Sequence, residues 1–358
     1  MSFSKKSFED LIKVALDHKA SDIHIRTDEV PCFRIKGEII PIKTKVFSDS
    51  DVHSILEILT EEKDIDVDKF NELDGGLELS GICRVRYNIF KYDRKYGAVL
   101  RLINSKIPSL EDLGLPSILK KISLQKRGLI LVTGPTGSGK STTLAAMIDY
   151  INQKRKAHVL TIEDPIEYLH EQKKSRISQR EVMTDTNDFI TALRSALRQD
   201  PDIILIGEMR DPETVSIALK AAETGHLVLS TMHTTNSVTT IGRILSLFKP
   251  EEQEAVRERL AENLYACIGQ RLLKGKEKPV LAQEIMITGP GIKDCIKGDD
   301  DIHRIFKIVA DGFGQEDIAT QTFDQCVGRL YEKGIISKEV AVSAVSSETD
   351  FLRSLELT

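Results

Sequence analysis

The stretch LILVTGPTGSGKSTT, residues 129–143, decides the fold: a strand-like apolar segment leads into a glycine-rich turn and then a helix-like segment. It matches the pattern G-x-x-x-x-G-K-[ST] in the strand-then-helix context that this pattern requires. Glycines let backbone N–H groups point at phosphates, the lysine adds positive charge, and the final hydroxyl can hold Mg²⁺. The sequence therefore predicts a nucleotide-binding loop formed by Gly134, Pro135, Thr136, Gly137, Ser138, Gly139, Lys140, Ser141 and Thr142.

Three further apolar segments predict buried parallel strands beside this loop. They are HVLTIED at residues 158–164, IILIGE at 203–208 and LVLSTMH at 227–233. Strands that are apolar along their whole length are typical of a sheet covered by helices on both faces. We therefore expect an α/β domain over residues 116–358, with a helical C-terminal part from about residue 287.

The first hundred residues have a different texture. Residues 1–104 are expected to form a small α+β domain, beginning with a helix that Ser7 could cap. Residues 105–115 contain Pro108 and interrupt both the helical and the strand periodicity, which predicts a linker. Two domains are also what a chain of 358 residues favours.

Charged side chains at the strand ends are the candidate catalytic groups, because ligands bind beyond the carboxyl ends of parallel strands. Glu208 ends its strand and, with Ser141, is expected to hold Mg²⁺, partly through water. Asp202 is a poorer candidate because it precedes that strand and lies at the opposite edge. Glu163 is then expected to orient or deprotonate the attacking water, and His233 to sense the γ-phosphate.

Composition limits the possible classes of protein. The net charge is −5, aromatic residues make up 5% and tryptophan is absent, which counts against a single-strand nucleic-acid motor. The five cysteines are scattered without a C-x-x-C pair, as in a reduced cytosolic protein without structural zinc. No apolar run approaches the length of about 20 residues that crosses a bilayer, so no transmembrane segment is expected.

The motifs ASDIHIR, GPTGSGKSTT, TIEDPIE, LRSALRQDPDIILIGEMRD and TGHLVLSTMHT occur in the order and spacing of the secretion-superfamily ATPases. The chain resembles in particular the PilT-like branch, which retracts type IV pili in twitching motility. The resemblance implies a hexameric ring of chains, each with a PAS-like N-terminal domain and a RecA-like P-loop ATPase domain, hydrolysing ATP with Mg²⁺. It also implies a cytoplasmic motor at the inner membrane that works with a PilC-like platform protein and sometimes a paralogous ATPase.

Several basic residues are further candidates for ATP contacts. Arg84 and Arg86 share a strand face, and Arg101 lies on the next expected strand. The resemblance implies that arginines of this segment reach the nucleotide of a neighbouring subunit, although an ordinary charged surface remains an equal alternative. His226 belongs to the same motif as His233 but precedes its strand, so structural and catalytic roles both stay open. Two downstream arginines are weaker candidates, Arg210 and Arg243.

Three alternatives to a retraction motor remain at this point. Retraction ATPases typically carry the segment AIRNLIRE, but residues 291–298 here read GIKDCIKG, which leaves a PilU-like accessory retraction ATPase open. An assembly or type II secretion ATPase usually has a larger N-terminal region and often a four-cysteine motif, and because neither is expected from this sequence, retraction is favoured over assembly. From a different class, a P-loop phosphotransferase or a nucleotide-gated regulator could use the same loop.

Overall fold

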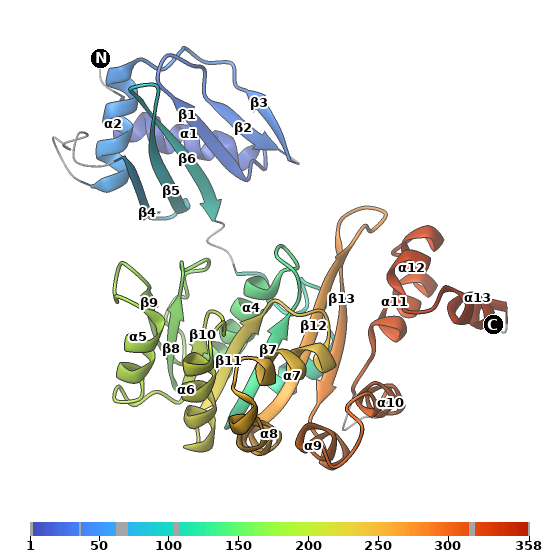
Figure 1. Ribbon diagram of the computed structural model, residues 1–358. Helices are drawn as coiled ribbons and strands as arrows, with labels where there is room; N and C mark the ends of the chain where they lie inside the picture. Colours follow the sequence, from blue (N-terminus) through green and yellow to red (C-terminus); the bar gives the residue numbers. More distant parts are fainter. Residues whose placement is uncertain (1–2, 36, 62–70, 104–106, 315–318, 357–358) are drawn as a thin grey trace. The chain divides into compact units, whose positions relative to one another are not determined.

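The computed structural model describes residues 3–35, 37–61, 71–103, 107–314 and 319–356, and the chain divides into two compact units (Figure 1). Unit 1 is Met1–Lys106 and unit 2 is Ile107–Thr358. Part of the expected linker packs into unit 2, because Leu110 is buried there beside Leu119 and Ile122. Each unit has a hydrophobic core of its own.

Unit 1 is a six-stranded antiparallel sheet with two helices, in the strand order β3-β2-β1-β6-β5-β4. Its core joins apolar residues of the sheet to those of the helices, such as Ile23 and Leu100 to Phe8, Ile12 and Ile55. The elements are α1 (Lys5–Asp17), β1 (Asp22–Arg26), β2 (Cys32–Ile35), β3 (Glu38–Pro41), α2 (Asp49–Thr60), β4 (Glu72–Leu79), β5 (Cys83–Tyr92) and β6 (Lys95–Ile103).

The first helix is where expected, but its cap is not. Ser4 is the N-cap of α1, and the backbone N–H of Ser7 donates to the Ser4 hydroxyl at 3.1 Å. Ser7 therefore lies inside the first turn, and the prediction that it caps the helix was wrong. A cap accepts from an N–H two or three residues later, so either serine could have been chosen from sequence alone.

Unit 2 is built on a seven-stranded sheet in the order β13-β12-β7-β11-β10-β8-β9. Only β13 runs antiparallel to its neighbour, and the four strands predicted from sequence lie adjacent and parallel at its centre. The strands are β7 (Gly128–Thr133), β8 (His158–Glu163), β9 (Arg176–Glu181), β10 (Ile203–Ile206), β11 (Leu227–Met232), β12 (Leu264–Leu273) and β13 (Val280–Ile287). The expected α/β class with a parallel P-loop sheet is confirmed.

Helices cover both faces of this sheet, which explains why its central strands are apolar throughout. Alternate residues of β7 face opposite cores: Leu131 packs with one set of helices and Ile130 with the other. The helices are α3 (Ile118–Ser123), α4 (Lys140–Lys154), α5 (Phe189–Ala196), α6 (Pro212–Glu223), α7 (Ser237–Ser246), α8 (Pro250–Asn263), α9 (Pro290–Lys297) and α10 (Arg304–Asp311).

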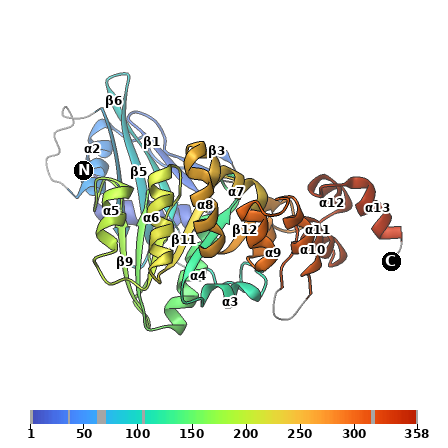
Figure 2. The same ribbon diagram turned by 60° about the horizontal axis from the view of Figure 1, so that its bottom comes forward.

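The last three helices lie beyond the β13 edge of the sheet in both views (Figures 1 and 2). They are α11 (Phe323–Glu332), α12 (Lys338–Ala344) and α13 (Glu348–Glu356), and they share a small core with Ala282 of β13. By contrast, α9 and α10 contribute Ile292 and Ile305 to the main core. The helical C-terminal part is therefore divided between two cores. Across the residues that the structure describes, no helix is long and apolar enough to cross a membrane.

Candidate functional site

The glycine-rich loop joins β7 to α4 and depends on backbone conformations that glycine favours. Gly134, Gly137 and Gly139 have φ values of 151°, 78° and 85°. A Cβ at Gly134 would also lie 2.5 Å from the carbonyl oxygen of Gln270, so no other residue fits there. The loop then delivers Lys140 to the first turn of α4, where free N–H groups favour an anion.

Lys140 bonds the backbone of its own loop. Lys140 Nζ donates to the carbonyl oxygens of Gly134 at 2.9 Å and Pro135 at 3.1 Å. Burial lowers the pKa of Lys140, so a bound phosphate would stabilise its charge. The Ser138 hydroxyl is buried and has no hydrogen-bond partner within the described chain. This pattern suits a loop whose full set of partners includes an anion.

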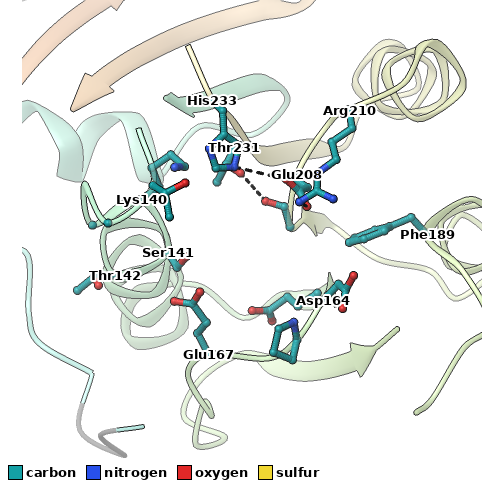
Figure 3. Close-up of a pocket in the computed structure, with 16 residues that line it drawn as sticks. Lys140, Ser141, Thr142, Asp164, Glu167, Phe189, Glu208, Arg210, Thr231 and His233 are labelled. Atoms are coloured by element: carbon teal, nitrogen blue, oxygen red, sulfur yellow. Dashed lines mark hydrogen bonds and ion pairs between the residues drawn. The ribbon is translucent and has the colours of Figure 1, made fainter. Parts of the chain in front are cut away.

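A cavity of about 420 Å³ opens over the loop at the carboxyl ends of the strands (Figure 3). It brings together the three strand-end side chains predicted from sequence, Glu163, Glu208 and His233, with Lys140 and Ser141. The other lining residues are Thr136, Gly137, Gly139, Thr142, Asp164, Pro165, Glu167, Phe189, Gly207, Arg210 and Thr231. Its position agrees with the rule that parallel sheets bind ligands at this edge.

Glu208 is at the centre of a charged group on one wall of this cavity. Its carboxylate lies 2.5 Å from Arg210 and 3.5 Å from His233 Nε2, as Figure 3 shows. The Glu208 side chain is 14% exposed, whereas that of Arg210 is 73% exposed and reaches toward solvent. Arg210, a weaker candidate from sequence, therefore lies within the site.

Glu163 lines the same cavity at the end of β8, the strand paired with β10. Its Oε1 accepts hydrogen bonds from Thr161 Oγ1 at 2.6 Å and from Gln179 Nε2 at 3.3 Å. Burial is the main cause that raises the pKa of Glu163 to about 7, and these two hydrogen bonds, with a third from the backbone N–H of Glu167, oppose that rise. A carboxylate with a pKa near 7 is suited to accept a proton from water.

The oxygen donors of the cavity fit Mg²⁺ but do not form a complete cage for it. Ser141 and Glu208 both line the cavity and offer the hydroxyl and carboxylate oxygens that Mg²⁺ prefers. Elsewhere in the described residues, as here, no cluster of three or more His, Cys, Asp or Glu could hold a metal by itself. A magnesium ion would therefore depend on phosphate and water oxygens for its remaining ligands.

The structure does not bring every predicted residue to the cavity. His226 lies at the other end of β11 from His233, where its Nδ1 is 2.9 Å from the carbonyl oxygen of Ala221 and 3.1 Å from the Thr224 hydroxyl. This arrangement ties the strand to the end of α6. Arg243 is an exposed residue of α7 and is not among the lining residues.

The candidate arginines of the N-terminal part lie on the sheet of unit 1. Arg86 of β5 is paired with Arg101 of β6 and is exposed. Arg101 Nε donates to Asp22 at 3.0 Å, which gives that side chain a structural partner. Arg84 lies two residues before Arg86 on the same strand face.

Some lining residues were not singled out from the sequence. Asp164, noted with Glu163 at the strand end, lines the cavity with Pro165 and Glu167 of the same segment, and so does Phe189, the first residue of α5. Thr231 stands two residues before His233, and its hydroxyl donates to the carbonyl oxygen of Gly207 at 2.7 Å. The TIEDPIE motif signalled the first group, but no pattern identified Phe189 or Thr231.

Comparison with known proteins assigns the chain to a family. The model of the family described as type II/IV secretion system protein matches residues 2–324. The type IV pilus retraction ATPase PilT of Pseudomonas aeruginosa is 45% identical over 335 residues, covering 93% of this chain and 96% of that protein. A twitching motility protein of Neisseria gonorrhoeae is also 45% identical, over 87% of this chain and 83% of that protein.

A second Pseudomonas aeruginosa protein, the type IV pilus ATPase PilU, is 36% identical over 98% of this chain and 91% of its own length. A crystal structure of the pilus retraction motor PilT with bound ADP is 40% identical and superposes with a TM-score of 0.87, covering 96% of this chain and 98% of that one. The chain belongs to the type II/IV secretion system protein family, in the group that contains the PilT pilus retraction ATPases.

Proposed function

We propose that this protein is an ATP-hydrolysing motor that powers retraction of type IV pili. The observation that carries the proposal is the cavity over the glycine-rich loop, where Glu163, Glu208 and His233 meet Lys140. The similarity to PilT over nearly the whole chain supports the same conclusion. The products of the reaction would be ADP and phosphate.

The side chains of the cavity would divide the chemistry between phosphate binding and water activation. Loop N–H groups and Lys140 would hold the phosphates, and the cavity-lining position of Glu163 supports a role for it in orienting the attacking water. As the water oxygen bonds to the γ-phosphorus and the bond to the ADP oxygen breaks, Glu163 takes the water proton. Arg210, which is paired with Glu208, offsets negative charge that develops on the γ-phosphate, and His233 beside Glu208 senses that phosphate.

Magnesium would be held by the Ser141 hydroxyl and, partly through water, by Glu208. When bound, it neutralises charge on the β- and γ-phosphates. Arg210 and His233 already lie against the Glu208 carboxylate, which keeps that group in place at the cavity wall.

The working form is proposed to be a homohexamer in which arginines of unit 1 complete the site of a neighbouring subunit. Arg86 is the first choice because it is exposed, whereas Arg101 is bound to Asp22. Cyclic packing of identical chains is the usual way to build such shared sites. The ring would act at the cytoplasmic face of the inner membrane on a PilC-like platform protein, in some systems together with a paralogous pilus ATPase.

An accessory role is the second candidate, because α9 carries GIKDCIKG where retraction ATPases typically have AIRNLIRE. In this chain Lys293 bonds Glu262 at 2.7 Å, and Lys297 bonds Glu258 at 2.9 Å, so both lysines are held against α8. A lysine that is held in this way is less available to a partner. The PilU similarity at 36% identity is consistent with this reading.

The proposal is tested with a Lys140→Ala variant in the native host. Loss of the lysine charge should reduce ATP turnover by about 100-fold or more, because phosphate binding depends on it. Cells carrying the variant, like cells lacking the protein, should show abundant pili that do not retract, counted by electron microscopy and scored by twitching. Loss of pili would indicate assembly instead, and unchanged retraction would support an accessory role. A phosphotransferase would consume ATP only when an acceptor is present.

A further inference from the structure

Gln179 of β9 lies beside the proposed catalytic carboxylate although it does not line the nucleotide cavity. Strands β8 and β9 pair in parallel, with Gln179 opposite Thr161. Residues that alternate along a strand share a face, so Glu163 projects from the same face as Thr161. The three side chains therefore meet at one edge of the sheet.

The amide of Gln179 makes three hydrogen bonds that fix its orientation. Its oxygen accepts from the backbone N–H of His170 at 2.8 Å. Its nitrogen donates to the carbonyl oxygen of Tyr168 at 2.8 Å and to Glu163 Oε1 at 3.3 Å. If the amide oxygen and nitrogen were exchanged, the nitrogen would face the N–H donor of His170 and the oxygen would face the two acceptor oxygens, so all three hydrogen bonds would be lost. The N–H that reaches Glu163 is thus held in place by the other two bonds.

Glu163 also lines a second, smaller cavity. It measures about 30 Å³, and its walls include Ser141, Tyr168, His170 and Thr231. A space of this size accommodates a single water molecule. His170 Nδ1 is buried and lacks a hydrogen-bond partner within the described chain, which makes it a suitable partner for that water. The Glu163 carboxylate therefore borders two spaces, the nucleotide cavity and this smaller one, whose other walls include Leu144, Ala145 and Leu205.

The charges around Glu163 do not favour the productive direction. Glu167 lines the nucleotide cavity on the same side and repels the carboxylate. His170 offers no opposing charge from the small cavity, because burial lowers its pKa to about 4 and keeps the ring neutral. The cations of the nucleotide cavity, Lys140 and Arg210, are bound to loop carbonyls and to Glu208. Hydrogen bonds from the Thr161 hydroxyl, the Gln179 amide and the backbone N–H of Glu167 are what hold Glu163.

We propose that Gln179 is a positioning residue for ATP hydrolysis: its amide holds Glu163 Oε1 and leaves Oε2 directed at the attacking water. This inference rests on the role proposed above for Glu163. Thr161 still bonds Oε1 when the Gln179 bond is lost, but the carboxylate then lacks the donor from β9 that fixes its rotation and turns more readily toward the small cavity. Gln179 itself would not touch the nucleotide, so its loss should affect the chemical step and spare binding.

The test is Gln179→Met in the full-length protein, because methionine keeps the length of the side chain and lacks the amide. We expect kcat to fall by about 10- to 100-fold, which corresponds to losing a hydrogen bond to a charged group. The KM for ATP should change by less than about twofold. A Gln179→Glu variant covers the case in which methionine impairs folding. Glutamate keeps an acceptor for the backbone N–H of His170 but removes the donor to Glu163. The kcat of this variant should fall at least as far as that of Gln179→Met.

Gln172→Met is the matched control, because this amide lies in the same segment and also makes two hydrogen bonds. Its nitrogen donates to the carbonyl oxygen of Ile177 and its oxygen accepts from the backbone N–H of Ile177, both at 2.8 Å. It does not bond Glu163, so its kcat should stay within about twofold of wild type. If Gln179 had a merely structural role, Gln179→Met and Gln172→Met would instead lower kcat and raise KM to similar extents. Wild-type kcat in both Gln179 variants would also overturn the inference.

A double variant separates this inference from the proposed function. In single-turnover experiments, Gln179→Met should add no further loss to Glu163→Gln, because the group that it positions is already gone. Multiplying losses would refute the positioning role. Full activity of Glu163→Gln alone would instead refute the role of Glu163. An inactive Glu163→Gln beside a fully active Gln179→Met would refute only the inference about Gln179.

Discussion

Among the side chains of the site, Glu163 is the one whose charge the fold opposes most clearly. It is removed from water at the end of β8, and its pKa rises to about 7 from an ordinary value of 4.5. The folded protein therefore binds a proton at Glu163 over a pH range in which the unfolded chain has released it. Keeping a carboxylate here lowers the stability of the fold at neutral and alkaline pH.

This cost predicts that Glu163→Gln stabilises the protein in a pH-dependent way. The unfolding free energy of the wild type should fall, relative to the variant, as pH rises from 4.5 to about 7, and the difference should then stay constant. The full difference is about 3 kcal/mol or less, since each pKa unit corresponds to about 1.4 kcal/mol. Urea unfolding of both proteins without nucleotide at pH 5 and pH 8 measures it. An equal difference at the two pH values would contradict the raised pKa.

The sequence allowed the residues of the site to be predicted where a recognised strand led directly to them. Glu163, Glu208 and His233 each follow an apolar run, and all three line the cavity. Gln179 was missed because β9, with the sequence RISQRE, is an edge strand with little apolar signal. His226 shows the converse case: its motif suggested catalysis, but its position before β11 gives it contacts with α6.

At the scale of elements, the loop that carries His233 is anchored by β13, the strand at the antiparallel edge of the sheet. This loop leads into α7, and the backbone N–H of Ser237 in the first turn donates to Glu284 of β13 at 2.7 Å. Glu284 is 2% exposed, and burial raises its pKa. The carboxylate at a helix N-terminus thus joins the antiparallel edge of the sheet to the His233 segment.

Replacing this anchor should destabilise the fold in a way that depends on the acceptor atom. Glu284→Ala leaves the Ser237 N–H buried without a partner and should lower the unfolding free energy by about 1 to 3 kcal/mol. Glu284→Gln keeps an oxygen at the same place and should lose less than about 1 kcal/mol. Chemical denaturation of the two variants provides the comparison. Equal losses would show that packing, rather than the hydrogen bond, sets the stability at this position.

Elements with strong patterns were predicted well and those with weak patterns were not. The strands β7, β8, β10 and β11 are apolar on both faces because both faces are buried, which made them visible in the sequence. The helix α2 was missed even though Ser48 and Asp51 form a capping box at its start. The pair β12 and β13 was also missed, because residues such as Gln270, Gln283 and Glu284 are buried there among apolar neighbours.

For the molecule as a whole, the candidate arginines and the phosphate-binding loop belong to different units of the chain, the arginines to unit 1 and the loop to unit 2. Lys140 lies in the cavity of unit 2, and Arg86 is exposed on the sheet of unit 1. If Arg86 completes the site of a neighbouring chain, two different inactive chains should complement each other in a mixed ring. A site that uses only its own chain's arginine could not be restored in this way.

We therefore expect Lys140→Ala and Arg86→Ala proteins to be inactive alone but active when mixed. In a randomly mixed ring at equal amounts, about a quarter of interfaces pair an intact loop with an intact arginine from the next chain. ATP turnover of the mixture, after dissociation and reassembly, should recover by up to about that fraction. Lys140→Ala mixed with Glu163→Gln is the matched control, because both residues belong to one cavity and no interface in the mixed ring restores it. Recovery only in the first mixture establishes a shared site, whereas no recovery in either would mean that each chain hydrolyses ATP with its own residues.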